Sequence, residues 1–260
     1  MDILDELCAR RRADAERAAR CTPLADLRLR AKALPAPRDF RAAFAGPGLH
    51  VIAELKKASP SEGLIRPDFD PVTLARGYAA NGAAAISVLC EPHRFLGDEA
   101  YLRAVRAAVE TPLLYKDFLT TDYQVVAARA AGADACLLIV AALDDATLAH
   151  LLALAHDLGL TALVETHTAE EIDRAVAVGA RLIGVNCRNL RTFHTDPAMT
   201  AALLGRIPAG VMRIAESGLR THDDLLNLRT AGADGFLIGT TLMRAPDPGE
   251  QLRRLCFTSA

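Results

Sequence analysis

Residues 51–63 read VIAELKKASPSEG, and this stretch decides how the rest of the chain is organised. It begins as a short apolar strand and ends where Glu54, Lys56 and Lys57 arrive together, before a turn rich in Pro, Ser and Gly. An apolar strand that delivers a carboxylate and two ammonium groups to its carboxyl end is typical of a pocket mouth. A strand that runs out onto a solvated surface has the same pattern, so the remaining chain must decide between the two interpretations.

Size and composition indicate a large globular domain. The chain has 260 residues, of which 51% are hydrophobic and 24% charged, and single α/β barrels commonly have this length. The formal net charge of −2 argues against a general nucleic-acid binder. No apolar run approaches the ~20 residues that cross a bilayer, and the charge-rich N-terminus lacks the apolar segment of a signal peptide. We therefore expect a cytoplasmic protein without a nucleic-acid or membrane partner.

The six cysteines give no sign of a metal site. None forms a Cys-x-x-Cys pair, and no nearby His completes the spacing of a zinc site. Cys136 lies inside an apolar strand and is interpreted as a small core residue. We expect free thiols and no metal.

A rhythm of Gly-Ala pairs divides the chain. The pairs begin at residues 82, 132, 179 and 232, and each ends a helical pattern and opens an apolar strand. They recur at intervals of about 50 residues, whereas a single strand–helix unit takes roughly half of that. Each interval is therefore expected to hold a further strand. The eight expected strands are residues 50–54, 84–89, 112–116, 134–140, 161–165, 181–186, 211–216 and 234–239.

Helical patterns fill the segments between these strands. Asp70, Thr121, Thr168, Asp196 and Thr221 stand where five helix N-caps are expected. The expected helices are residues 71–80, 99–109, 122–131, 144–158, 169–178, 197–207 and 222–231. Eight short, nearly all-apolar strands that alternate with helices predict a parallel sheet closed into a (β/α)8 TIM barrel. A doubly wound sheet is the alternative, but the Gly-x-Gly-x-x-Gly turn expected after its first strand is missing.

The segment before the barrel is expected to be helical. Residues 1–45 form this N-terminal extension and residues 46–260 form the barrel, one structural domain overall. Within the extension we expect one helix over residues 3–19 and a second, short helix around residues 40–44, with prolines between them. The extension either covers the mouth of the barrel or seals its opposite end.

A barrel of this kind carries its chemistry at the carboxyl ends of its strands. Polar and ionisable residues gather at those ends, with the fourth strand as the exception. They are Glu54 and Lys56, Cys90 and Glu91, Lys116 and Asp117, Glu165, Asn186 and Arg188, Glu216 and Ser217, and Gly239 and Thr240. One charged strand end has little meaning, but so many on one rim predict a site.

The last two strand-end loops predict a phosphate site. In such barrels the loops after strands 7 and 8 often bind phosphate through backbone N–H groups and the start of a short helix. Gly218 and Gly239 allow the backbone to approach closely, and Ser217 and Thr240 add hydroxyl donors. The helix-forming Leu-Met-Arg that follows supports this interpretation, although tight turns alone have the same composition.

Lys116 and Glu165 are the first candidates for proton transfer. Apolar neighbours flank Lys116, and partial desolvation is expected to lower its pKa, which suits proton transfer or a Schiff base. Burial of Glu165 is expected to raise its pKa. A structural ion pair is the alternative for either residue. His93 and His167 in rim loops are further acid–base candidates, and Asp117 is expected to cap or orient.

Seven motifs together resemble one family. IAELKKASPSEG, LYKDF, LLIVAAL, LVETHT, IGVNCRNL, AESGL and FLIGTTLMR occur in this order and closely resemble the indole-3-glycerol-phosphate synthase family of tryptophan biosynthesis. The resemblance runs from about residue 44 to residue 255. The helical extension also matches that of the family, which favours its placement over the mouth. The resemblance implies a carboxy-lyase that converts 1-(2-carboxyphenylamino)-1-deoxyribulose 5-phosphate to indole-3-glycerol phosphate, CO₂ and water without metal or organic cofactor.

The resemblance also implies catalytic roles. Lys116 is expected to be the general acid that protonates the ribulose carbonyl as the aromatic carbon attacks it. Glu165 is expected to act as acid or base in the later dehydration and rearomatisation. Lys56 is expected to pair with substrate charge and to share proton transfer with Lys116. Glu54 and Asn186 are expected to position Lys56, the substrate hydroxyls and the aryl amine.

The family motifs imply substrate-binding residues as well. Phe95 resembles the aromatic residue that lines the anthranilate pocket, although core packing is the ordinary explanation of a lone Phe, and Arg188 fits the anthranilate carboxylate. Tyr115, Cys90 and Cys187 depart from the family pattern, which puts the pocket wall in question. The other implied binding positions are Ser59, Glu216 and, for the phosphate, Ser217, Gly218, Gly239 and Thr240.

Three other functions fit parts of the pattern. Another phosphosugar barrel, such as an isomerase, explains the phosphate loops but not a Lys on each of strands 1 and 3 together with a Glu on strand 5. A flavin-binding oxidoreductase fits the last two strands alone. A non-catalytic phosphate-binding barrel does not explain why Glu54, Lys56, Lys116, Glu165 and Asn186 occur together. We expect a phosphorylated small molecule as the partner of a monomer or weak homo-oligomer.

Overall fold

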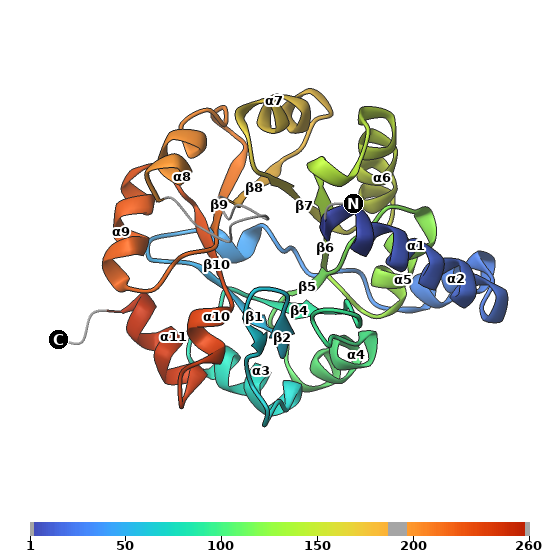
Figure 1. Cartoon of the computed structure of the whole chain (residues 1–260), viewed down its shortest axis with the longest axis horizontal. Helices are drawn as coiled ribbons and strands as arrows, with labels where there is room; N and C mark the ends of the chain where they lie inside the picture. The colour runs from blue at the N-terminus through green and yellow to red at the C-terminus, as the bar shows by residue number, and fades with distance from the viewer. Residues whose placement is uncertain (1–2, 187–196, 258–260) are drawn as a thin grey trace.

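The computed structural model describes residues 3–186 and 197–257 of the chain. Its centre is a closed barrel of eight parallel strands with helices around it, which confirms the predicted (β/α)8 TIM barrel (Figure 1). The order around the barrel is β1 (Val51–Leu55), β4 (Ala85–Leu89), β5 (Leu113–Lys116), β6 (Ala135–Ile139), β7 (Thr161–Thr166), β8 (Leu182–Asn186), β9 (Met212–Glu216) and β10 (Gly235–Ile238), which pairs with β1. A short hairpin of β2 (Ala58–Ser59) and β3 (Gly63–Leu64) follows β1.

Helices cover the outside of the barrel. They are α3 (Pro71–Ala80), α4 (Glu99–Ala108), α5 (Asp122–Ala130), α6 (Asp145–Asp157), α7 (Ala169–Ala177), α8 (Pro197–Leu204), α9 (His222–Thr230) and α11 (Pro248–Cys256), with the short η2 (Val140–Ala142) and α10 (Thr240–Met243) in strand-end loops. Asp70, Thr168 and Thr221 accept N-cap hydrogen bonds as predicted, whereas the Thr121 side chain makes no cap bond. The predicted cap Asp196 lies outside the described residues. Across residues 3–186 and 197–257, none of the helices has the length and apolar character that a bilayer crossing requires.

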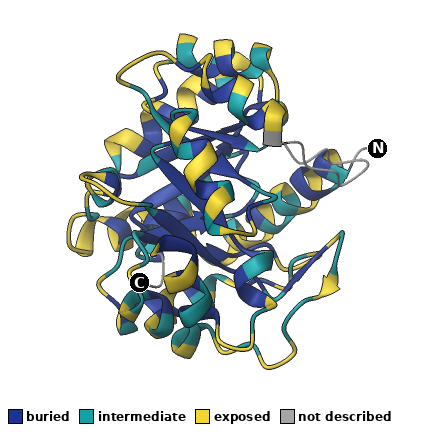
Figure 2. Ribbon diagram, turned by 90° about the vertical axis from the view of Figure 1, so that its left-hand side faces the viewer, coloured by how far each residue is buried: buried dark blue, intermediate teal, exposed yellow. Residues whose placement is uncertain are grey.

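Alternation along the strands separates two apolar clusters and aims the charged residues inward. Ile52, Leu114, Leu163 and Ile214 belong to a cluster that fills the barrel, while their strand neighbours pack under the helices. Figure 2 shows the buried strands inside a shell of helices whose outer faces are exposed. Because successive side chains point to opposite faces, the residue two positions after each of these four also points inward. Those residues are Glu54, Lys116, Glu165 and Glu216.

The N-terminal extension differs from the expectation in its second helix. It contains α1 (Ile3–Cys21), α2 (Leu24–Ala33) and the 3₁₀ turn η1 (Ala42–Phe44). The helix expected around residues 40–44 is therefore wrong, because only one short 3₁₀ turn forms there, and α2 was not predicted. The α2 sequence lacks a side-chain N-cap, and its buried face consists of Leu27 and Ala31 alone. α2 is stabilised by packing against α5. This tertiary contact cannot be predicted from the sequence of α2 alone.

The extension reaches both ends of the barrel. Leu4 and Cys8 of α1 pack onto the apolar interior from the side where the strands end (Figure 1). Phe40 and Phe44 enter the same cluster from the opposite end. Gly235 leaves room for this plug, since a Cβ at that position would lie 2.6 Å from the Phe44 ring. Of the two placements left open by the sequence, α1 covers the mouth and η1 seals the other end.

Candidate active site

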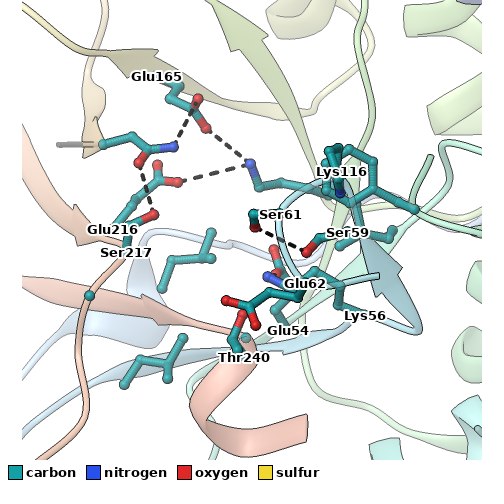
Figure 3. Close-up of a pocket in the computed structure, with 18 of the residues that line it drawn as sticks. Glu54, Lys56, Ser59, Ser61, Glu62, Lys116, Glu165, Glu216, Ser217 and Thr240 are labelled. Atoms are coloured by element: carbon teal, nitrogen blue, oxygen red, sulfur yellow. Dashed lines mark hydrogen bonds and ion pairs between the residues drawn. The ribbon is translucent and has the colours of Figure 1, made fainter. Parts of the chain in front are cut away.

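A pocket of about 960 Å³ lies at the carboxyl ends of the strands (Figure 3). It brings together nearly all of the residues that the sequence singled out. Those that line it are Glu54, Lys56, Ser59, Phe95, Lys116, Glu165, Asn186, Glu216, Ser217, Gly218, Gly239 and Thr240. The remaining predicted residue, Arg188, lies outside the described residues, and so does Cys187. Within residues 3–186 and 197–257, no cluster of His, Cys, Asp and Glu is arranged to hold a metal ion.

One side of the pocket is a chain of polar contacts that crosses four strands. The Lys116 Nζ on β5 lies 3.0 Å from Glu165 Oε2 on β7 and 3.9 Å from Glu216 Oε2 on β9. Asn186 Nδ2 on β8 donates to Glu165 Oε1 at 3.2 Å, and the Ser217 hydroxyl after β9 donates to Asn186 Oδ1 at 2.8 Å (Figure 3). These contacts hold Glu165, Glu216 and Asn186 in a buried cluster around the Lys116 ammonium.

Lys116 stays protonated, which corrects the expectation that desolvation lowers its pKa. Burial alone does act in that direction, but the Glu165 carboxylate first, and then Glu216 and Glu54, outweigh it and raise the pKa above the ordinary value of a lysine. An ammonium with a raised pKa is a poor nucleophile, so the Schiff-base alternative loses support. A permanent cation in this position suits hydrogen-bond or proton donation to a developing negative charge.

The expectation for Glu165 is also wrong. Burial would raise the pKa of this carboxyl, but Lys116 and His167, with the hydrogen bonds from Lys116 and Asn186, lower it to about 2. Glu165 is therefore an ionised carboxylate near neutral pH. Burial would lower the pKa of His167, but Glu171 and Glu165 raise it. The His167 Nε2 lies 3.5 Å from Glu165 Oε1, an ion-pair contact that is too long for a hydrogen bond.

Glu216 is the carboxyl whose proton is retained. Burial, and then the neighbouring Glu165 carboxylate, raise its pKa well above the ordinary value. Its Oε1 is buried and has no hydrogen-bond partner among the described residues. This oxygen rests against Gly184 of β8, where a Cβ would lie 2.1 Å from it. The sequence marked Glu216 only as a binding position and gave no sign that it differs in charge from Glu165.

The other side of the pocket holds a second ion pair. Lys56 Nζ, just beyond β1, lies 2.8 Å from Glu54 Oε1, and both side chains are nearly buried. Gly239 faces this pair, because a Cβ there would lie 2.2 Å from Glu54 Oε1 and 2.9 Å from Lys56 Nζ. The absence of a side chain at residue 239 is thus already required by the ion pair, whatever else binds there.

The loops after β9 and β10 present backbone and hydroxyl groups to the pocket. Ser217 has φ 66° and Gly218 has φ 75°, so two consecutive residues are left-handed. For a serine this conformation is uncommon and typical of functional loops. The Thr240 hydroxyl, at the start of α10, is buried and has no hydrogen-bond partner among the described residues. These features support the predicted phosphate loops.

The wall opposite these loops is aromatic. Phe95 and Phe118 line the pocket, with ring centroids 6.1 Å apart. The loop that carries Phe95 is organised by Glu91, whose buried carboxylate accepts the backbone N–H groups of His93, Arg94 and Phe95. Phe118 and the role of Glu91 were missed by the sequence analysis. The Glu-Pro pair followed by a Gly six residues after the Glu was the available signal of a tight, self-capped loop.

The departures from the family pattern do not alter the described pocket wall. Tyr115 points away from the barrel interior, and its hydroxyl lies 3.3 Å from Glu99 Oε2. Cys90 is buried and donates toward the Val88 carbonyl. Neither residue lines the pocket, so any effect of these two on its shape would be indirect.

α1 is clamped over the mouth by ion pairs. Arg11 donates to both carboxylate oxygens of Asp117, through Nη2 at 2.6 Å and Nε at 2.9 Å. Asp14 Oδ2 lies 2.7 Å from His93 Nε2, and a further pair joins the ends of Glu6 and Arg94. His93 therefore contacts the extension and does not line the pocket, whereas Asp117 does both. Ile3, Leu4 and Leu7 of α1 also line the pocket.

We expect Arg11→Gln to lower the free energy of unfolding by about 3–5 kcal/mol, because it leaves the buried Asp117 carboxylate without its partner. Only 1% of the Asp117 side chain is exposed, against 14% for Arg11. Thermal unfolding measures the loss, at about 2–4 °C of Tm per kcal/mol for a chain of this size. Arg10→Gln is the control, since Arg10 pairs with Glu6 on the surface and should change stability by less than ~0.5 kcal/mol. Equal effects of the two variants would contradict the clamp.

The closed barrel with a charged pocket at the carboxyl ends of its strands defines a class, the TIM-barrel enzymes that act on small polar substrates. Within that class, the family model described as indole-3-glycerol phosphate synthase matches residues 4–255. The chain belongs to the indole-3-glycerol phosphate synthase family. This membership removes the support for the isomerase, flavin and scaffold alternatives.

Individual relatives agree with the family. The indole-3-glycerol phosphate synthase of Micrococcus luteus is 50% identical over 258 residues, which cover 97% of this chain and 96% of the relative. That of Laribacter hongkongensis is 49% identical over 259 residues, 98% of each chain. Among solved structures, a 3-hexulose-6-phosphate synthase matches with a TM-score of 0.66 and 17% identity over 80% of this chain and 98% of that one. At that identity the structural match shows the barrel fold alone.

Proposed function

We propose that this pocket converts 1-(2-carboxyphenylamino)-1-deoxyribulose 5-phosphate to indole-3-glycerol phosphate, CO₂ and water, with Lys116 as the general acid of ring closure. The observation that carries the proposal is a permanently charged ammonium held among the side chains of three glutamates inside a pocket of about 960 Å³. When the aromatic carbon attacks the ketone, its oxygen becomes an alkoxide that needs a proton. A preorganised cation stabilises that charge and donates the proton.

Glu165 and Glu216 are proposed to have different roles in the steps after ring closure. Ring closure is followed by loss of CO₂ from the ring carbon. The hydroxyl then leaves as water while the methylene carbon beside the ring nitrogen gives up a proton, so that the indole keeps its N–H. Glu165, ionised because of Lys116 and Asn186, is the proposed base that accepts the proton of the methylene carbon. Glu216, which retains its proton, is the proposed acid that turns the hydroxyl into water. Two neighbouring carboxyls with pKa values moved in opposite directions support this division.

The substrate is proposed to lie across the pocket. Its phosphate is placed at the loops after β9 and β10, supported by the unpartnered Thr240 hydroxyl and the left-handed Ser217 and Gly218. Its anthranilate ring is placed against Phe95, where Phe118 completes an aromatic wall. The remaining assigned positions follow from the same orientation: Lys56 and Glu54 at substrate charge and hydroxyls, Asn186 at the aryl amine, Ser59 and Gly239 beside the phosphate, and Arg188, outside the described residues, at the carboxylate.

The surroundings of the reaction are part of the proposal. We propose a cytoplasmic enzyme, supported by the free thiols Cys8, Cys90, Cys136 and Cys256, all of them buried. We keep residues 1–45 as the extension and residues 46–260 as the barrel of one structural domain, supported by the packing of the extension at both ends of the barrel. The expectation of a monomer or weak homo-oligomer also stands as a proposal.

Product formation tests the function. Mixing the protein with the carboxyphenylamino-deoxyribulose phosphate in the presence of a metal chelator is expected to give indole fluorescence and one CO₂ for each molecule of product. Indole without CO₂ release, or CO₂ release without indole, would contradict the reaction. If a folded protein gives neither indole nor CO₂, the proposed reaction is wrong and the chain shares only the fold of the family.

The pH dependence of turnover tests the role of Glu216. Because its pKa is raised, the acid is protonated below its folded-state pKa and is lost as the pH rises through that value. The alkaline limb of kcat/KM is therefore expected to belong to Glu216, since Lys116 titrates above the ordinary range of a lysine. Glu216→Gln is expected to lower kcat about 10²-fold and to flatten that limb. An unchanged alkaline limb in the variant would assign it to another group.

Stability offers an independent check on the same proton. A raised pKa stabilises the folded state fully below the unfolded value, and this contribution disappears as the pH rises through the folded value. Urea unfolding at about pH 5 and about pH 9 is expected to show a larger loss for the wild type than for Glu216→Gln, whose amide does not titrate.

A further inference from the structure

A second pocket, of about 310 Å³, lies at the opposite end of the barrel. Thr161 and Leu182, the first residues of β7 and β8, form its floor. Arg41 just before η1, His156 near the end of α6 and Arg181 just before β8 form its walls. Strands present their amino-terminal ends here, away from the catalytic face, so nothing in the proposed reaction uses this pocket.

The pocket gathers positive charge without a countercharge. Within residues 3–186 and 197–257, neither the Arg41 nor the Arg181 guanidinium has an ion pair, and the buried Nε of Arg41 has no hydrogen-bond acceptor. Two other arginines at this end of the barrel are in ion pairs. Arg106 Nη1 lies 2.9 Å from Asp134 Oδ2, and Arg38 pairs with Glu110. The end of the barrel thus neutralises some of its arginines and leaves the pair at the pocket unneutralised.

The positive charge of the two arginines affects the pKa of His156. Its pKa is lowered by burial and then by Arg181 and Arg41, and the only acidic group acting on it among the described residues is the neighbouring Asp157. A histidine beside two guanidinium groups, with Asp157 as its one acidic neighbour among the described residues, faces a net positive local potential. Such a potential attracts an anion of matching size.

We propose that this pocket binds a small phosphate-type dianion between Arg41 and Arg181. Each guanidinium presents a planar fork of N–H groups that matches two oxygens of a phosphate, and the Thr161 hydroxyl on the floor adds a donor. The volume lies at the lower end of the range for ligand pockets, which fits inorganic phosphate or a short phosphorylated metabolite and excludes a nucleotide-sized ligand.

Binding at this site acts on the strands that carry the active site. Thr161 lies four residues before Glu165 on β7, and Leu182 lies four residues before Asn186 on β8. The separation along each strand is about 13 Å. A dianion that bridges η1 and the starts of β7 and β8 binds the folded state and not the unfolded state. It is therefore expected to raise the apparent stability with concentration.

The imidazole of His156 provides a local probe of occupancy. We would follow the histidine Cε1–H signals by NMR, assign His156 with His156→Gln, and titrate pH with and without sodium phosphate. Sodium chloride keeps the ionic strength constant, because salt alone weakens the repulsion from the arginines. Phosphate is expected to raise the pKa of His156 with half-saturation in the millimolar range, as for a few charge-assisted hydrogen bonds in an open site.

Controls separate this site from the active site and from general screening. His150 also lies on α6 but pairs with Asp122 on the surface, so its Cε1–H signal should not move when phosphate is added. Arg41→Gln and Arg181→Gln are each expected to remove the phosphate-dependent shift, whereas Arg206→Gln, at an exposed pair with Asp173, should retain it. A shift that chloride reproduces, or one that persists in the Arg41→Gln/Arg181→Gln double variant, would overturn the proposal. If ribose 5-phosphate reaches half-saturation at a lower concentration than inorganic phosphate does, the occupant is a phosphorylated metabolite.

Discussion

Lys116→Met is expected to lower kcat by about 10⁴-fold or more, because it removes both a general acid and the cation that faces the developing alkoxide. Methionine keeps most of the volume of the lysine stem, so the pocket should not collapse. The Lys116 Nζ is the shared partner of Glu165 at 3.0 Å and Glu216 at 3.9 Å. Without it, Glu165 loses the strongest of the influences that lower its pKa, so the pKa rises and the ionised form of the base is less favoured when the acid is removed.

Single-turnover formation of indole-3-glycerol phosphate measures this loss, with substrate binding followed separately. Lys57→Met is the matched control, because Lys57 is in the same β1 loop as Lys56 but does not line the pocket, and it should retain nearly full activity. Circular dichroism and thermal unfolding check that the variant is folded. A folded Lys116→Met protein within about tenfold of the wild-type rate would transfer the acid role to Lys56, the other lysine in the pocket.

Local patterns in the sequence were sufficient to predict the barrel. The Gly-Ala pairs mark the turns where helices end and strands begin, and strands buried on both faces read as continuous apolar runs. All eight strands followed from these signals. α2 did not, because its stability depends on the face of α5 against which Leu27 and Ala31 pack. α11 was also missed, although Asp247 as N-cap and Pro248 at the first turn were available signals.

The site could be located from the sequence, but its protonation states could not. A residue at the carboxyl end of a barrel strand faces the rim, so Glu54, Lys116 and Glu165 were placed correctly from their strands alone. The pKa of each group depends on which charged side chains lie close together inside the barrel. Lys116 contacts Glu165, which is two strands away, and Glu216, which is four strands away. The resulting pKa combines their attraction with the effect of burial, and no local sequence pattern indicates it.

The clamp of the extension was hidden for the same reason. Arg11 and Asp117 are 106 residues apart, and each is unremarkable among its neighbours. Asp117 directly follows Lys116, so the pair that fixes α1 over the mouth also anchors the end of the strand that carries the ammonium. The extension therefore contributes to the site through packing and through the position of β5, neither of which a motif records.

Glu165→Gln is expected to lower kcat by about 10³-fold, because an amide of the same shape does not accept the proton of the methylene carbon beside the ring nitrogen. The substitution has a second consequence within the cluster. Lys116 then has Glu216 as its nearest carboxylate, which is drawn toward the ionised form by the ammonium and freed from the repulsion of Glu165. The dehydration step should lose its base and its acid together, while ring closure, which depends on Lys116, should be less affected.

This ordering makes the variant informative beyond its rate. Glu165→Gln is expected to form the ring-closed intermediate, so CO₂ release should outpace the appearance of indole fluorescence in a single turnover. Glu171→Gln is the control, since Glu171 contacts His167 but does not line the pocket, and both signals should stay synchronous in it. If CO₂ release slows as much as indole formation in Glu165→Gln, the carboxylate already acts before ring closure is complete, and its role must be moved to the first step.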